Sequence, residues 1–391
     1  MPVLHAKLSA SGAKRWLNCP GSVQASELYP STTSIYAEEG TLAHSVAEET
    51  ITTGEVSART KRKIKLFYEE HDELNGSVEE MLESLDDYIA YVQEEFYDDR
   101  RLDPAAVLMT EQRVDFSKYV PGGFGTSDVI LIRDKRLHII DLKYGKGVEV
   151  SAEDNPQLSL YALGAIDTLE SVYDIDEVVM TIYQPRIGNV STAVTTRREL
   201  EAWGNDVVIP GAKLAASKDA PMAAGEWCQF CPHKAACRER ARLLKEMEEY
   251  RLRISLTPEE IGEILSTGDM VKKFIEDVEK QALADALDGE EIPGWKVVEG
   301  RSNRKLAGSE DEIIRRAEDA GFDRSLLYET KMLGLTAMET LMGKKTFAKA
   351  MDGIIEKPAG KPTLVPESDR RPAIVNSSAE EDFAGEFNGG N

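Results

Sequence analysis

The chain has 391 residues, 41% of them hydrophobic, and a formal net charge of −23. This length and apolar content are enough for one large domain with a smaller one beside it. The negative charge argues against indiscriminate binding of nucleic acid, because a polyanion is repelled at long range. Any contact with DNA must therefore use local basic residues.

The first part of the chain, to about residue 103, has the apolar spacing of helices. A helix beginning near residue 39 carries His44, and a lone helical histidine is more often solvated or hydrogen-bonded than a metal ligand. Over 78–96, apolar residues recur with the period of an amphipathic helix. The segment 105–116 then predicts a strand that pairs with the hairpin after it.

The segment 125–147 carries the strongest single pattern in the chain. It predicts a hairpin of two apolar strands joined by a two-residue turn at Asp134-Lys135. In that register Asp128 faces Asp141, and Lys143 returns to the face of Asp141 because side chains alternate along a strand. Two neighbouring carboxylates indicate a divalent cation, and the lysine indicates an anion such as phosphate on that cation. An ordinary surface salt bridge explains an isolated Asp-x-Lys equally well.

The next elements complete a sheet. Asn155-Pro156 opens a helix that places Gln157 and Tyr161 one turn apart on the same face. A strand over 177–186 follows, and the order of hairpin, helix and strand suits a mixed sheet with a right-handed crossover. A helix over 197–218 then leads to a group of cysteines.

The cysteines are the second strong signal. Three of them have the spacing C-x2-C-x5-C and the fourth is far away in the sequence: Cys228, Cys231, Cys237 and Cys19. We expect no secreted disulfide framework, because neither a signal-peptide pattern nor a membrane-spanning apolar run is seen. Four thiolates can hold structural zinc or an iron–sulfur cluster, and spacing alone favours zinc.

The pattern changes after about residue 245. Thr257-Pro258 is a helix start, and a long helix is expected over 269–287. Residues 294–306 predict a strand and a basic loop, Ser309 caps a further helix, and two short helices flank Gly343.

Three regions follow from these patterns: a first domain over 1–245, an α-rich accessory domain over 246–356, and an extended or disordered tail over 357–391. The basic loop is a candidate contact for DNA phosphates, although a contact between domains or with another subunit explains it almost as well. Three residues make up this patch: Arg301, Arg304 and Lys305.

The motifs resemble a known set. Asp128, Asp141-Leu142-Lys143 and Gln157-x3-Tyr161 resemble the motifs of the PD-(D/E)XK nucleases, and the Gln-x3-Tyr element resembles their RecB-like branch. Ser127 stands where that branch often has proline. Gly40-x-x-x-His44 matches the helix from which a histidine in that branch supplies a further metal ligand.

The resemblance covers residues 1 to about 245. It implies an α/β fold with a PD-(D/E)XK restriction-endonuclease-like core, a mixed central sheet flanked by helices, followed by a mainly helical accessory domain. One cysteine before the core and three after it are similar to the AddB-type and CRISPR-associated RecB-like exonucleases. The resemblance therefore implies a 4Fe–4S cluster, with structural Zn²⁺ as the alternative.

The resemblance also implies roles for the motif residues. Four groups would hold Mg²⁺ or Mn²⁺: His44, Asp128, Asp141 and the Leu142 carbonyl. Lys143 would orient the attacking water, and Gln157 and Tyr161 would position Lys143 or the substrate phosphate.

The expected function is that of a metal-dependent DNA exonuclease for recombination or DNA-end processing. The accessory region resembles a phage and prophage family, which implies action in the bacterial host cytoplasm, with a single-strand annealing protein as partner and no membrane. A homo-oligomer stays open. So do two alternatives: a non-catalytic DNA-binding or assembly subunit on a nuclease fold, and a nuclease subunit active only in a larger complex.

Overall fold

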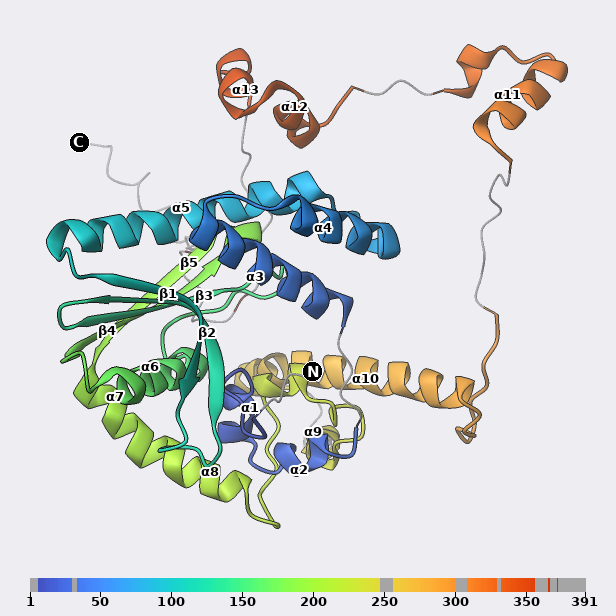
Figure 1. Cartoon of the computed structure of the whole chain (residues 1–391). Coiled ribbons are helices and arrows are strands. Elements are labelled where there is room, and N and C mark those ends of the chain that lie inside the picture. The colour runs from blue at the N-terminus through green and yellow to red at the C-terminus, as the bar shows by residue number, and fades with distance from the viewer. Residues whose placement is uncertain are drawn as a thin grey trace, which may run out of the picture. The chain divides into compact units, whose positions relative to one another are not determined.

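A five-stranded sheet with strand order β1-β2-β3-β4-β5 lies at the centre of the fold (Figure 1). The computed structural model describes residues 6–29, 34–246, 256–299, 308–328, 332–355, 365 and 371. All neighbouring strands are antiparallel except β3 and β4, which are parallel. The strands are β1 (Val107–Asp115), β2 (Phe124–Arg133), β3 (Arg136–Leu142), β4 (Glu177–Gln184) and β5 (Asn189–Thr196).

Helices cover both faces of this sheet, so the expected α/β class with a mixed sheet flanked by helices is confirmed (Figure 1). One face packs against α3 (Ile35–Thr53) and α5 (Val78–Leu102), with α4 (Ala58–Glu70) packed on them. The other face packs against α6 (Pro156–Leu169), α7 (Arg197–Trp203), α8 (Ile209–Ala215) and α1 (Ala13–Asn18). The sheet therefore separates two apolar cores.

The remaining elements are short or lie outside these layers. The α-helices are α2 (Ser22–Ser26), α9 (Arg238–Glu246), α10 (Pro258–Leu287), α11 (Glu310–Asp319), α12 (Leu335–Met342) and α13 (Lys344–Ala350). The tighter or wider turns are η1 (Asp72–Leu74), η2 (Pro185–Ile187), η3 (Gly204–Val208), η4 (Glu226–Phe230) and η6 (Arg324–Leu327). Within the ranges that the structure describes, no helix is both long and apolar enough to cross a membrane.

The predicted hairpin is confirmed in its turn and its register. Arg133 pairs with Arg136, and Asp134 adopts a φ of 47°, the left-handed conformation that a tight hairpin turn requires. The helices α3, α5 and α6 and the strands β1 and β4 also form where the sequence predicts them. The periodicity of α5 is clear because it buries one face against the sheet, whereas β4 and α6 are apolar runs that are buried on nearly all sides.

Two predicted helices and one predicted strand need correction. The helix over 197–218 forms over Arg197–Ala215 but contains a wide turn at Gly204–Val208, since Pro210 lacks the N–H for a regular helical bond. The helix start at Thr257-Pro258 is confirmed, and the helix expected over 269–287 is the continuation of that same helix through Gly268. Residues 294–299 are irregular rather than a strand, and 300–307 lie outside the described residues. The edge strand β5 was not predicted, because its half-buried, polar-rich sequence has no apolar run.

The chain divides into the compact units Met1–Ile292 and Pro293–Asn391. Helix α10 belongs with the first unit, not with an accessory domain beginning at 246. Asp277 of this helix accepts a hydrogen bond of 2.6 Å from Arg240, and its other carboxylate oxygen lies 2.9 Å from Lys234 Nζ. Periodicity alone could not assign this helix to a unit. Apart from residues 365 and 371, the expected tail lies outside the described residues.

A buried ion pair joins the layer of α3 to the turn after β4. Arg186 Nη1 lies 3.0 Å from Glu39 Oε2, and the two side chains are only 8% and 5% exposed. Tyr68 of α4 donates a hydrogen bond of 2.8 Å to the other Glu39 oxygen. Removing one charge would leave the other buried and unpaired.

We predict that Arg186→Met lowers the free energy of unfolding by about 3–5 kcal/mol in urea titrations. Adding Glu39→Gln should recover most of that loss, because the remaining amide still accepts the Tyr68 hydrogen bond. Arg101→Ala, which breaks an exposed pair with Asp98, should cost less than about 1 kcal/mol. A full-sized loss in the double variant would show that the charge pair is not the cause.

Candidate metal and catalytic site

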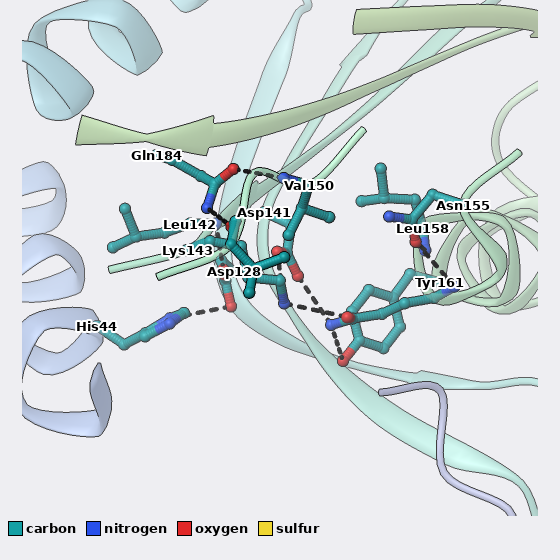
Figure 2. Close-up of polar contacts among 12 residues, drawn as sticks. His44, Asp128, Asp141, Leu142, Lys143, Val150, Asn155, Leu158, Tyr161 and Gln184 are labelled. Carbon is teal, nitrogen blue, oxygen red and sulfur yellow. Dashed lines mark hydrogen bonds and ion pairs between the residues drawn. The ribbon is translucent and has the colours of Figure 1, made fainter. Parts of the chain in front are cut away.

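The site lies where β2 and β3 meet the two helix layers. Figure 2 shows His44 pointing toward Asp128 from one side and Tyr161 lying on the helix at the other side of the group around Asp141. Helix α3 brings one of these residues, β2 and β3 bring two, the residue after β3 adds one, and α6 adds two. They are His44, Asp128, Asp141, Lys143, Gln157 and Tyr161.

The ladder between β1 and β2 is interrupted at the site. Its pairs continue in one register on both sides of Glu111 and Asp128, which face each other without pairing. Glu111 has a φ of 46°, a left-handed conformation that costs a non-glycine residue about 1–3 kcal/mol. Met109 and Val114 pack against the same core although their separation is odd, so β1 changes face here. Glu111 and Asp128, the two residues at this distortion, are therefore not paired in the ladder, and both carry carboxylates.

Asp128 is the meeting point of three elements. Its Oδ2 accepts a hydrogen bond of 2.7 Å from the Leu142 N–H, and its Oδ1 lies 3.2 Å from His44 Nδ1. Glu111 Oε1 lies 3.9 Å from the same histidine nitrogen. One ligand atom from each of His44, Glu111 and Asp128 lies within 4.8 Å of the others. This trio can hold a metal ion.

Asp141 belongs to a second cluster. Its Oδ2 lies 2.8 Å from Lys143 Nζ, and its Oδ1 accepts a hydrogen bond of 2.9 Å from Gln157 Nε2. Lys143 also donates to Gln157 Oε1 at 3.0 Å, and Gln157 Nε2 donates to the Tyr161 hydroxyl at 3.3 Å. Tyr161 can lie over β2 because Gly125 has no side chain, and a Cβ there would be 2.6 Å from its ring. Lys143 is thus held in place by two partners, Asp141 and Gln157.

The residues that lie together in the structure differ from the metal ligands that the sequence predicts. His44 and Asp128 come together as expected, but Asp141 is turned toward Lys143 rather than grouped with them. The hairpin pairing ends at Val129 and Ile140, so Asp128 reaches the Leu142 N–H instead of lying paired with Asp141. The fit to a cation is supported by the donor set of the trio, one imidazole nitrogen and two carboxylates, while Asp141 Oδ2 is buried and pairs with Lys143.

Glu111 was missed by the sequence reasoning. The signal that could have found it is its place in the strand Val107–Asp115, opposite Asp128 in the register of the β1–β2 pair. The proposed DNA contacts of the accessory loop cannot be placed in this site. They lie outside the described residues: Arg301, Arg304 and Lys305.

Crowded negative charge perturbs the protonation of the site. Burial lowers the pKa of His44, but the charge and hydrogen bond of Asp128 outweigh it and raise that pKa to about 9. Burial, and then the charge of Asp128, raise the pKa of Glu111 to about 7. Burial also raises the pKa of Asp141, against the opposing charge of Lys143. A divalent cation would relieve the same repulsion.

The four cysteines are buried, and none forms a disulfide. The Ala223 N–H donates to Cys19 Sγ at 3.3 Å, and the Gly225 N–H donates to Cys228 Sγ at 3.4 Å. Such bonds suit thiolates that hold a metal group. A single zinc ion would bring its sulfurs to about 3.8 Å from one another. No three of these thiols, all of which the structure describes, lie within 4.8 Å of one another, so the structure itself shows neither a zinc site nor a cluster site.

A family model described as "Protein of unknown function (DUF2800)" matches residues 5–372. This chain belongs to the DUF2800 family. A solved structure titled "Crystal structure of SSO0001" is similar to 51% of this DUF2800 chain and to 95% of its own length, with 14% identity and a TM-score of 0.20. A likeness at that score carries no argument, so the function must be reasoned from the residues.

We predict that the metal-free protein loses about 2 kcal/mol of its free energy of unfolding between pH 7 and 9. The folded pKa of His44, about 9, lies above its ordinary value of 6.5. The stabilisation of the fold by protonated His44 is therefore complete below pH 6.5 and is lost as the pH rises through about 9. Urea titrations in EDTA would measure this.

His44→Gln should flatten the dependence over that range. His71→Gln, which removes a histidine near Glu73 outside the site, should leave it intact. An unchanged slope in His44→Gln would show that the His44–Asp128 pair does not stabilise the fold.

Proposed function

We propose that this protein is a metal-dependent deoxyribonuclease with a RecB-like PD-(D/E)XK core, acting as an exonuclease in the recombination or end processing of phage or prophage DNA. The observation that carries the proposal is a lysine fixed by Asp141 and Gln157 beside the carboxylates of Asp128 and Glu111. The antiparallel β1–β2–β3 followed by α6 and the parallel β4 supports the assignment of the core.

The donor set suits Mg²⁺ or Mn²⁺. Carboxylates favour the first ion, and a histidine is well tolerated by the second. The residues that would hold the ion are His44, Glu111 and Asp128, with Asp141 and the Leu142 carbonyl as further ligands. When bound, the ion supplies Lewis acidity and an activated water.

The remaining chemistry belongs to Lys143 and its partners. The ammonium group orients the attacking water and balances charge that develops on the phosphoryl oxygens. Asp141 keeps Lys143 charged: burial lowers the pKa of Lys143, but the Asp141 charge outweighs it and raises the pKa. Gln157 sets the direction of the lysine by accepting from Nζ while donating to Asp141. Tyr161 supports Gln157 from the next helical turn.

A second candidate is a nuclease subunit that is active only in a larger complex. The unit Pro293–Asn391 favours it, because several of its large apolar side chains are exposed. Leu326 is 72% exposed, Leu341 75% and Met332 88%. Exposed apolar surface of this kind is typical of residues covered by a partner. Light scattering combined with nuclease assays on the isolated chain would separate the two candidates.

We predict that Asp141→Asn and Lys143→Ala each lower the rate of DNA cleavage at least about 100-fold, because each removes a group that acts on the water or the phosphate. The assay uses end-labelled linear DNA and closed circular DNA with Mg²⁺ or Mn²⁺. An exonuclease degrades the linear DNA only. Lys143→Ala should keep its affinity for Mn²⁺, because the lysine is not a ligand.

Lys135→Ala is the matched control, since it removes a lysine from the turn of the same hairpin. Lys135 pairs with Asp174 and Asp176 on the surface. Its loss should leave cleavage unchanged. Full activity in Asp141→Asn would overturn the proposal.

We further propose that the cysteines hold a 4Fe–4S cluster. Protein purified without oxygen should be brown and contain about four iron and four sulfide per chain. Cys19→Ser should destabilise the whole first unit, because Cys19 ties α1 and α2 to the segment after α8. Stoichiometric zinc without iron after anaerobic purification would contradict the cluster.

A further inference from the structure

Arg113 and Phe124 form a stacked pair on the β1–β2 arm next to the site. The Arg113 guanidinium carbon lies 3.9 Å from the centre of the Phe124 ring. The two residues are diagonal neighbours, since Arg113 pairs with Thr126 and Phe124 pairs with Asp115. Arg113 is exposed and lies two residues along β1 from Glu111, a distance of about 7 Å.

The strand pattern fixes the face on which this pair lies. Val114 packs into the core beneath α6, and Gly125 lies against Tyr161 of α6. Arg113 and Phe124 are their chain neighbours, so they point to the opposite face. That is the face of the sheet from which α3 brings His44 to Asp128. The stacked pair therefore continues the surface beside the metal trio.

The hydrogen-bonding capacity of Arg113 is available to a ligand. The neighbouring Asp115 accepts a hydrogen bond of 2.8 Å from the Ser117 N–H, and its pKa is lowered first by hydrogen bonding to the Ser117 side chain and then by this backbone bond. Arg113 makes no ion pair within 4.0 Å in the part of the chain that the structure describes, although its charge helps to lower the pKa of Asp115. A guanidinium held on an aromatic ring keeps one face and its N–H edge free.

We propose that Arg113 and Phe124 seat an unpaired nucleotide next to the cleaved phosphate, so that the preferred substrate has a single-stranded end. This inference rests on the proposed nuclease function. The free face of the guanidinium stacks with a base, and its N–H groups bind a phosphate. A base inside a duplex cannot reach that face, because it is already stacked on its neighbours. In so acidic a chain, a local cation beside the metal trio also offsets repulsion of the DNA.

The test is the binding of a labelled single-stranded oligonucleotide by fluorescence anisotropy in EDTA, where no cleavage occurs. Arg113→Ala should weaken binding about tenfold, the loss expected for one stacked base. Arg113→Lys keeps the positive charge but removes the planar guanidinium on which a base can stack, and it should weaken binding nearly as much. Phe124→Leu should have a similar effect because it removes the support of the guanidinium. Binding of a blunt duplex should change less than twofold.

Hydrolysis of bis(4-nitrophenyl) phosphate separates the seat from the metal site, because this small diester has no flanking nucleotide. All three variants should hydrolyse it at the wild-type rate with Mn²⁺. Arg100→Ala is the matched control, since it removes an exposed arginine that lies 5.7 Å from the centre of the Phe96 ring on α5. It should bind the single strand as the wild type does.

Two results would overturn the proposal that Arg113 and Phe124 bind an unpaired nucleotide. The first is wild-type binding by Arg113→Ala. The second is full binding by Arg113→Lys, which would show that Arg113 acts only through its charge. Should Phe124→Leu fail to fold, the two Arg113 variants decide the question. A wild-type protein that hydrolyses neither DNA nor the small diester would instead refute the nuclease proposal, and the anisotropy result would still decide whether the pair binds a nucleotide.

Discussion

The site depends on one constraint: Asp128 must leave the β-ladder and still have every oxygen satisfied. It does so by accepting from the Leu142 N–H on one side and pairing with His44 on the other. This arrangement requires the break in β1 that puts Glu111 into a left-handed conformation. A regular ladder would turn both carboxylates into the apolar layers, where their desolvation would be uncompensated. The strain and the charge crowding are two consequences of the same distortion.

The mixed topology explains why two helix layers can serve one site. The parallel crossover from β3 to β4 requires a connection that covers one face, and α6 is that connection. It places Gln157 against Asp141. The other face is closed by α3 and α5, which bring His44 to Asp128. Apart from Lys143, which directly follows β3, each side chain of the candidate site therefore comes from a helix or strand whose position is set by apolar packing.

The sequence predicts those parts of the site that depend on local periodicity. The two-residue turn fixes the register of β2 and β3, and alternation then places Lys143 beside Asp141. The one-turn spacing of Gln157 and Tyr161 is equally local. Glu111 was not predicted, because the register that places it opposite Asp128 comes from the pairing of β1 with β2, which periodicity within β1 does not fix. The interruption before Pro210, the weakly apolar β5 and the assignment of α10 to the first unit likewise depend on tertiary packing.

The strong negative charge of the chain is compatible with a site that binds a polyanion only if positive charge is concentrated where the substrate lies. The structure has one such cation on each face of the sheet near the carboxylates. Lys143 is held on the α6 face by Asp141 and Gln157, and Arg113 is held on the other face by Phe124. Both are fixed in position by neighbours, so little conformational entropy is lost when they contact a ligand. For the proposed DNA substrate, these two cations would offset long-range repulsion locally at this edge of the sheet.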